Sequence, residues 1–259
     1  MEFIPTVDSE KLSFASSTLV LPIVSTGNVA QLAVDLLIAS RGLRRVGILD
    51  AQDLFSVTGA REDGETGVTT PLEIFGKEGG SFYVIQQRSP VLKARKEHFI
   101  SSFLDFVQQQ KFGSLLVLSG VDVSIRSDQQ MQNPTYHYVP VKAPSLAAPL
   151  SSISTIVPPY SAPTQLDLPA SGEHAQGQDS GVPFMPGSGL TRRLLSSLPP
   201  TLPAAALLEF VLEGDNRADA QMLASVVAKV LGLENVEWKE PSSWRQGLFG
   251  TPHDQTLFG

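Results

Sequence analysis

Cysteine is absent from all 259 residues of the chain. This absence excludes disulfides, thiolate nucleophiles and zinc sites built on cysteine. The fold must therefore rest on packing. Because 42% of the residues are hydrophobic, the chain has enough apolar material for a substantial core.

Basic residues are also in short supply, since 19 Lys and Arg face 26 Asp and Glu for a net charge of -7. Nucleic-acid-binding domains usually carry a basic patch, so this balance argues against nucleic acid as a partner. No apolar run approaches the roughly 20 residues that span a bilayer. The amino terminus has no basic flank before an apolar segment, as a secretory signal would. We expect an intracellular soluble protein that binds neither nucleic acid nor membrane.

Recognisable catalytic and ligand-binding motifs are missing as well. The four histidines are scattered, without the spacing of metal ligands. Residues 187–191 (GSGLT) lack the lysine of a P-loop, and Ser188 lacks the G-x-S-x-G frame of a nucleophile elbow. The turn at 25–28 has one glycine where a dinucleotide fingerprint has three. We interpret both loops as tight turns and expect no catalytic residue, no metal site and no cofactor.

Strands and amphipathic helices alternate along the chain. Apolar runs at 18–24 and 45–50 predict two buried strands. Between them the apolar residues repeat at helical spacing from Asn28, which with Gln31 resembles a capping box. Such a strand-helix-strand unit favours a parallel pair with a right-handed crossover. Further strands are predicted at 72–75, 81–86, 114–119 and 204–212, and further helices at 93–110 and from a cap at 215–216 to Gly232. The alternation indicates an α/β fold, a three-layer-like sheet with flanking helices.

Residues 141–181 differ from the rest of the chain in composition. They are rich in Ser, Pro and Ala, carry few charges and have no sustained periodicity. A segment of this length inside a domain is either disordered or a functional loop, and its composition favours disorder. We therefore interpret the chain as one α/β domain at 1–239, with a disordered insert at 141–181, followed by an extended C-terminal tail at 240–259.

The C-terminal region carries both tryptophans and an apolar end. Trp238 and Trp244 precede a terminus that reads Leu257, Phe258, Gly259. Capture of a terminal carboxylate beside a side-chain pocket is a known mode of peptide recognition. For the last three residues we favour binding to a partner. For the tryptophans two interpretations stay open, contact with a partner or coverage of the chain's own core.

Four blocks of sequence are distinctive: VSTGNVAQLAVDLLIAS at 24–40, PGSGLTRRL at 186–194, LLEFVLEGDNRADA at 207–220 and PSSWR at 241–245. In the same order, these blocks resemble blocks of the proteasome assembly chaperone family. They bracket most of the chain, and four ordered blocks are more specific than any single glycine pattern.

The resemblance implies a non-enzymatic protein of the cytoplasm and nucleus with an α/β fold similar to that of nucleoside phosphorylases. It implies a heterodimer with a related chaperone, proteasome assembly chaperone 1, that binds the α-subunit ring of an immature proteasome core particle. In such proteins a hydrophobic residue, a tyrosine and any final residue enter pockets between α subunits. The corresponding residues here are Leu257, Phe258 and Gly259, with phenylalanine in place of tyrosine.

Asn28, Gly187, Gly189 and Trp244 are candidates for the partner interface, with a purely structural role as the alternative. A rival from another class is a nucleoside phosphorylase-like or hydrolase-like enzyme with a small-molecule pocket under the two glycine loops. It requires polar groups that converge at strand ends. A third alternative is a scaffold whose tail is irrelevant to function.

Overall fold

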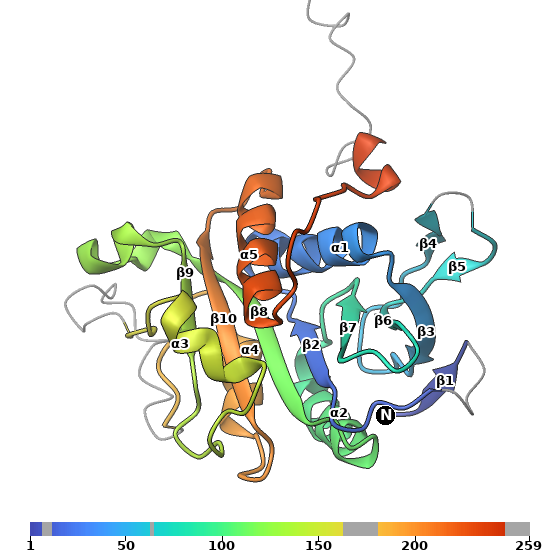
Figure 1. Cartoon of the computed structure of the whole chain (residues 1–259), viewed down its shortest axis with the longest axis horizontal. Coiled ribbons are helices and arrows are strands. Elements are labelled where there is room, and N and C mark those ends of the chain that lie inside the picture. Colours follow the sequence, from blue (N-terminus) through green and yellow to red (C-terminus); the bar gives the residue numbers. More distant parts are fainter. Residues whose placement is uncertain (7–11, 63–64, 163–180, 247–259) are drawn as a thin grey trace, which may run out of the picture.

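The computed structural model describes residues 1–6, 12–62, 65–162 and 181–246. Its centre is an eight-stranded mixed sheet with the strand order β1-β3-β6-β7-β2-β8-β10-β9 (Figure 1). The strands of this sheet are β1 (Phe3–Pro5), β2 (Thr18–Pro22), β3 (Arg44–Leu49), β6 (Leu72–Gly76), β7 (Phe82–Gln87), β8 (Ser114–Asp122), β9 (Thr135–Tyr138) and β10 (Ala204–Val211). A separate two-stranded hairpin consists of β4 (Gly59–Ala60) and β5 (Val68–Thr69).

The middle of the sheet is parallel and fully buried. Strand β2 pairs in parallel with β7 and β8, and β8 pairs in parallel with β10. Every residue of β2 and β10 is buried. Parallel strands covered on both faces are typically continuous apolar runs, which is why the sequence predicts these strands at the observed positions.

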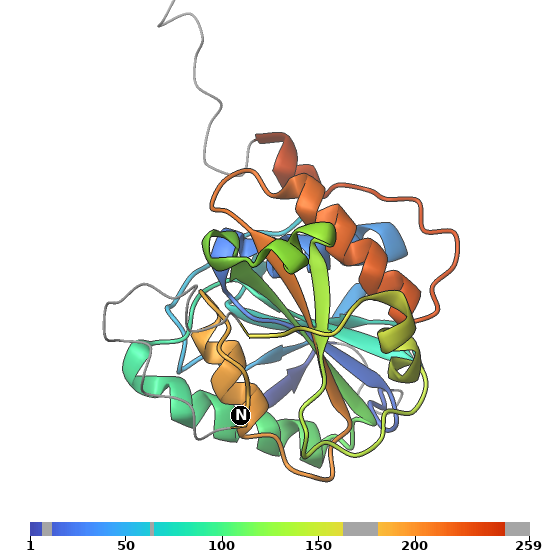
Figure 2. The same ribbon diagram turned by 90° about the vertical axis from the view of Figure 1, so that its left-hand side faces the viewer.

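Helices cover both faces of the sheet, so the molecule has three layers. Figure 2 shows α1 and α5 on one side and α2 and α4 on the other. The apolar residues Phe99, Phe103 and Phe106 of α2 are all buried, as their spacing predicts. The helices are α1 (Val29–Arg41), α2 (Lys96–Gln109), α3 (Ile153–Ile156), α4 (Gly189–Ser196) and α5 (Arg217–Val230), with short 3-10 helices η2 (Thr26–Asn28), η4 (Lys93–Arg95), η5 (Val123–Ile125), η6 (Asp128–Gln132), η7 (Leu150–Ser152) and η10 (Ser242–Gln246). The predicted α/β fold is confirmed, while the implied likeness to nucleoside phosphorylases stays a prediction.

The predicted parallel pair of β2 and β3 is wrong. The two strands run in the same direction, but β6 and β7 lie between them. The reason is the antiparallel β6–β7 hairpin, because β7 becomes the parallel neighbour of β2 while β6 pairs with β3. Helix α1 therefore crosses over two strands.

The predicted capping box at Asn28 and Gln31 is also wrong. Asn28 has the left-handed angles φ 49° and ψ 21°, and its side chain makes no capping hydrogen bond within the described residues. The η2 turn comes directly before α1, so Asn28 belongs to that turn and lacks the extended backbone of an N-cap. The other end is as predicted: Gly42 is left-handed, and its N–H donates to the carbonyl of Ile38.

The predicted disorder of the insert is wrong for the part that the structure describes, residues 141–162 and 181. Helices η7 and α3 form there, and Leu150 and Ile153 are buried in the core under α1 and α5. The physical reason is that a few well-spaced apolar residues bury themselves against α5 despite the polar composition around them. Residues 163–180 of the insert lie outside the described residues.

Candidate functional site

The two glycine loops that the sequence singles out meet at the carboxyl ends of β2, β8 and β10. We call this region the loop junction and define it as residues 25–28, 119–122, 186–189 and 212–216. Its parts contact one another directly, as the N–H of Asp122 donates to the carbonyl of Pro186 at 3.0 Å. The sequence separates these loops by up to 190 residues, and only the sheet brings them together.

Three glycines allow the loops of the junction to touch. A Cβ on Gly27 would lie 2.4 Å from Nδ2 of Asn216, and one on Gly120 would lie 2.2 Å from the carbonyl of Thr26. A Cβ on Gly187 would lie 2.1 Å from Oγ1 of Thr26. These separations are far below van der Waals contact, so a residue without a side chain is required at each position.

Hydrogen bonds between the loops use the polar groups of the junction. The N–H of Gly120 donates to Oγ of Ser25 at 2.8 Å, and the hydroxyl of Ser188 donates to the carbonyl of Gly120. The N–H of Gly27 donates to Oε1 of Glu213 at 3.1 Å. The groups therefore satisfy one another.

Asn216 links the first and last loops of the junction. Its Nδ2 donates to the carbonyls of Gly27 at 3.1 Å and Leu212 at 2.9 Å. The sequence predicts that Asn216 caps α5, but its side chain makes no capping hydrogen bond to that helix. The nearby Asp215 accepts the N–H of Arg217 at 3.3 Å instead. The side-chain amide of Asn216 thus joins two loops by hydrogen bonds, and Asn216 and Gly27 are 189 positions apart in sequence.

The junction has the convergent polar groups that the rival enzyme requires, but these groups bond to one another, and the loops approach closely at three glycines. Of the predicted site residues, Asn28, Gly187 and Gly189 are exposed at its surface. A partner can reach these three residues. The geometry therefore supports a structural role for the loops of the junction, with part of their surface accessible to a partner.

Trp244 is part of the chain's own core and not of the loop junction. It is 4% exposed and packs in the cluster of α1 and α5, with Trp238 packed partly buried against the same cluster. Of the two interpretations of the tryptophans, coverage of the core holds for Trp244. The predicted boundary at 239 is too early, since the ordered fold continues through η10.

We call residues 238–246 the strap. Glu62, just after β4, accepts three hydrogen bonds from it: Oγ of Ser242 at 2.7 Å, the N–H of Ser243 at 3.0 Å and Oγ of Ser243 at 2.5 Å. Burial alone would raise the pKa of Glu62, but the bonds from Ser243 and Ser242 outweigh it and lower that pKa. The carboxylate is therefore ionised at neutral pH.

A cavity of about 640 Å³ lies between the strap and the β4–β5 hairpin. Its lining includes the large apolar side chains of Ile38, Leu43 and Phe75, and about half of the lining residues are charged. The charged residues of the lining are Asp35, Arg44, Arg45, Arg61, Glu62, Glu65, Arg88, Lys239 and Glu240. The mixture of signs gives the cavity no strong preference for an anion or a cation.

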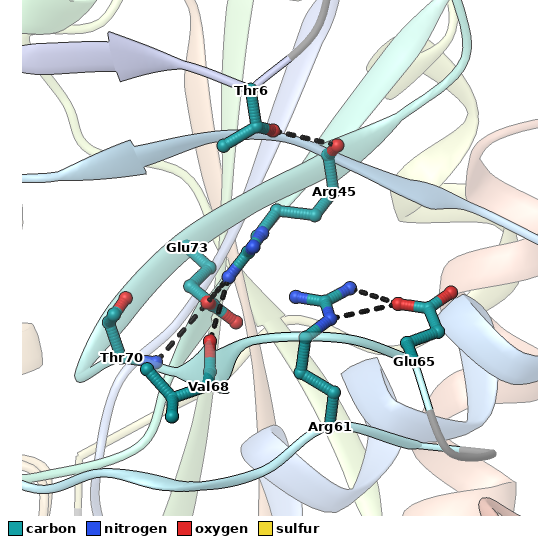
Figure 3. A network of polar contacts seen from close by, with 7 residues as sticks. All are labelled: Thr6, Arg45, Arg61, Glu65, Val68, Thr70 and Glu73. Carbon is teal, nitrogen blue, oxygen red and sulfur yellow. Dashed lines mark hydrogen bonds and ion pairs between the residues drawn. The ribbon is translucent and has the colours of Figure 1, made fainter.

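Ion pairs hold the walls of this cavity in place. Nη1 of Arg45 donates to Oε1 of Glu73 at 2.6 Å and to the carbonyl of Val68 at 2.9 Å, and Nε of Arg61 donates to Oε2 of Glu65 at 2.9 Å (Figure 3). The network ties the hairpin to β3 and β6. It fixes the surface on which Glu62 is displayed.

Sequence reasoning missed a second buried polar group on the α1 face. Arg88 makes a bidentate pair with Asp35, at 2.8 and 2.9 Å, and Nε2 of Gln86 donates to Oδ1 of Asp35 at 2.7 Å. The signal was available, because Asp35 stands between the apolar residues Val34 and Leu36 in the middle of a helix with a largely apolar face. A buried aspartate needs a charged partner, which predicts an arginine on the sheet beneath.

Glu209 is the other missed group, a carboxyl in the C-terminal half of β10 with no exposed surface. Burial raises its pKa to about 8, although a hydrogen bond from Oγ1 of Thr135 acts in the opposite direction. The charge of Asp219 adds to the increase and that of Arg126 reduces it. The carboxyl is therefore largely protonated at neutral pH.

In the ranges that the structure covers, no group of three or more His, Asp or Glu side chains is placed to hold a metal ion. None of the helices in those ranges is both long enough and apolar enough to cross a bilayer. The predicted tail residues Leu257, Phe258 and Gly259 lie outside the described residues.

Comparison with known proteins identifies close relatives in sequence over the full chain. Proteasome assembly chaperone 2 of Xenopus laevis is 29% identical over 269 residues, which cover 99% of this chain and 100% of the relative. The protein of the same name from Homo sapiens is 27% identical over 275 residues, with the same coverage.

Solved structures share the fold. Pyrococcus furiosus PbaA, an archaeal homolog of proteasome-assembly chaperone, superposes with a TM-score of 0.62 at 14% identity and covers 91% of this chain and 88% of its own. Pyrococcus furiosus PbaB, an archaeal proteasome activator, superposes with a TM-score of 0.58 at 15% identity and covers 90% of each chain. At these identities the likeness shows the fold alone.

The model of the PAC2 family matches residues 19–231 of this chain. This range begins in β2 and ends just past α5, so it includes the parallel strands and every loop of the junction. Because the match covers most of the chain, the chain belongs to the PAC2 family.

Proposed function

We propose that this chain is a proteasome assembly chaperone without catalytic activity that acts in the cytoplasm and nucleus. It forms a heterodimer with proteasome assembly chaperone 1, and the pair binds the α-subunit ring to promote assembly of the core particle. The observation that carries the proposal is the alignment with relatives named proteasome assembly chaperone 2, which extends over nearly the whole length of both chains. The filled loop junction supports a role without small-molecule chemistry.

The C-terminal residues make the contact with the ring in this proposal. The side chains of Leu257 and Phe258 enter a pocket between α subunits, and the carboxylate of Gly259 meets a lysine as a charge-assisted contact. Burial of the phenylalanine ring contributes about 2–3 kcal/mol. The missing tyrosine hydroxyl costs about 1 kcal/mol of hydrogen bonding. The conformational entropy that the tail loses on docking keeps the binding reversible.

The heterodimer contact uses the exposed surface of the loop junction. Asn28, Gly187 and Gly189 are exposed there, and the rigid hydrogen-bonded loops present them without a large loss of conformational entropy. Trp244 is excluded from this surface because it is buried in the chain's own core.

The test is co-purification of the tagged full chain from its native cell, in parallel with a chain lacking 257–259. We expect the full chain to bring down a related chaperone and α subunits, and the truncated chain to keep the chaperone but lose most of the α subunits. Recovery of neither partner by the full chain would refute the proposal.

Substitutions at the penultimate position sharpen the test. F258A should weaken recovery of α subunits about as much as the truncation, because the buried ring is lost. F258Y restores the hydroxyl and should bind as well as the native chain or more tightly. Gln255→Ala, outside the three docking residues, is the matched control and should have no effect.

A further inference from the structure

We propose that Glu62 is a positioning residue for the C-terminal tail: it fastens the strap to the body and so fixes the point from which the tail extends. This inference rests on the proposed function, in which the tail docks on the α ring. It adds the structural element that controls the docking, at a site remote from the last three residues.

The first support is the concentration of hydrogen bonds on one carboxylate. Both oxygens of Glu62 are used, Oε2 by Ser242 and the backbone of Ser243 and Oε1 by the hydroxyl of Ser243. Bonds to an ionised acceptor are stronger than bonds between neutral groups. The bonds join positions 180 residues apart in sequence, so they are tertiary contacts and no part of the local turn.

The second support is that the strap is held on both sides of Ser243. On one side the N–H of Lys239 donates to Oγ of Ser40 at 2.8 Å, and Pro241 is buried. On the other side Trp244 occupies the core between α1 and α5. Glu62 lies between these two attachments and joins the strap to the loop after β4.

The consequence for docking follows from chain length. With the strap fastened, 13 residues (247–259) separate the body from the end of the chain. With the strap released, 22 residues (238–259) separate them. Effective concentration falls about as the −3/2 power of linker length, so the increase from 13 to 22 residues lowers it about twofold. Release of the strap should weaken tail-dependent binding by about that factor.

The experiment first measures the strap without any partner. Amide hydrogen exchange at 239–246 is compared in the full native chain, E62A and E65A. Emission of Trp244 is compared in the same three chains, each carrying W238F. Glu65 is the matched control, because it pairs with Arg61 and makes none of the strap bonds described for Glu62. We expect faster exchange and red-shifted emission for E62A, and native behaviour for E65A. Native exchange in E62A would overturn the inference, whatever the function.

The second measurement is affinity for α rings, in complex with the partner chaperone, with and without residues 257–259. We expect E62A to bind about twofold more weakly than E65A when the tail is complete, and equally when it is removed. Loosened exchange without any loss of tail-dependent affinity would overturn the positioning role.

A full-length native chain that binds no better than the truncated chain would remove the proposed docking itself, and with it the positioning role. That failure is distinct from the failure of the strap measurement, which involves no partner. If E62A does not fold, S243A removes one of the three donors and is carried through both measurements. Unchanged exchange and affinity in S243A would then count against the inference.

Discussion

At the residue scale, glycines decide how closely the loops of the junction approach. Gly187 and Gly189 are two positions apart in one loop and both exposed, yet their surroundings differ. Gly187 has φ 73° and almost touches Thr26, whereas a Cβ on Gly189 would meet nothing within 4 Å. Substitution of Gly187 therefore tests whether the fold requires glycine there. Substitution of Gly189 tests whether a partner contacts that surface.

G187A should lower the free energy of unfolding by about 3 kcal/mol, because the left-handed backbone is strained for alanine and the new methyl group collides with Thr26. G189A should leave it unchanged or raise it by up to about 1 kcal/mol, since alanine is the better helix former. Urea denaturation of both variants is the measurement. Equal stabilities would contradict the close approach described for Gly187.

Glu209 predicts a pH dependence of stability. Its pKa in the folded protein is about 8 against an ordinary value of 4.5, so between these values the folded state holds a proton that the unfolded state has lost. Stability should therefore fall as pH rises from about 5 to 8, by at most about 1.4 kcal/mol per pH unit from this group. E209Q is neutral throughout and should lack this decline. Denaturation curves at pH 5, 6, 7 and 8 measure the difference, and parallel pH profiles for the two chains would refute the assignment.

Individual polar residues were the hardest to predict from sequence. Asn28 and Gln31 are residue types that form capping boxes, but Asn28 ends the 3-10 helix at 26–28 with left-handed backbone angles. The tie made by Asn216 depends on a loop 189 residues away. Local patterns cannot encode such contacts, because the strand order that creates them is a tertiary property.

At the scale of elements, apolar runs predicted the positions of those strands that are buried on both faces. The fully buried β2 and β10 lie where their apolar runs predict. The edge strands β1 and β9 were missed, since three or four residues with mixed burial give no periodic signal. The order of the strands was not predictable, because the β6–β7 hairpin could pair on either side of β3.

The ordered part of the insert gives a prediction at this scale. Leu150 is fully buried against the core of α1 and α5, while Val141 in the same segment is 88% exposed. L150A should therefore cost about 3 kcal/mol of stability, and V141A should cost less than about 0.5 kcal/mol. Urea denaturation is again the measurement. If L150A behaves like V141A, the packing of this segment on the domain is disproved.

At the scale of the whole molecule, the domain ends later than the composition suggests. The apolar periodicity stops near Leu233, and the two tryptophans beyond it were compatible with a free tail. Burial of Trp244 and partial burial of Trp238 show instead that the strap completes the core. A single large side chain separated from the last helix by a polar stretch carries no sequence signal for its own burial.

Two truncations test this boundary. A chain that ends at Gln246 keeps every contact described here and should match the full chain in stability. A chain that ends at Leu233 loses Trp244 from the core and should be less stable by at least about 3 kcal/mol. Thermal and urea denaturation distinguish them, and equal stability of the two truncated chains would show that the strap contributes nothing to the fold.

The place of β10 in the sheet affects how the chain is made. It pairs with β8 on one side and β9 on the other, yet 73 residues of synthesis separate the end of β9 at Tyr138 from the end of β10 at Val211. At about 5–20 residues per second, the ribosome needs about 4–15 seconds after β9 to complete the synthesis of β10. Throughout that interval the facing edges of β8 and β9 are unpaired templates for another chain. A protein proposed to guide assembly therefore exposes unpaired strand edges during its own synthesis. In that interval it depends on the cell's protection of nascent chains.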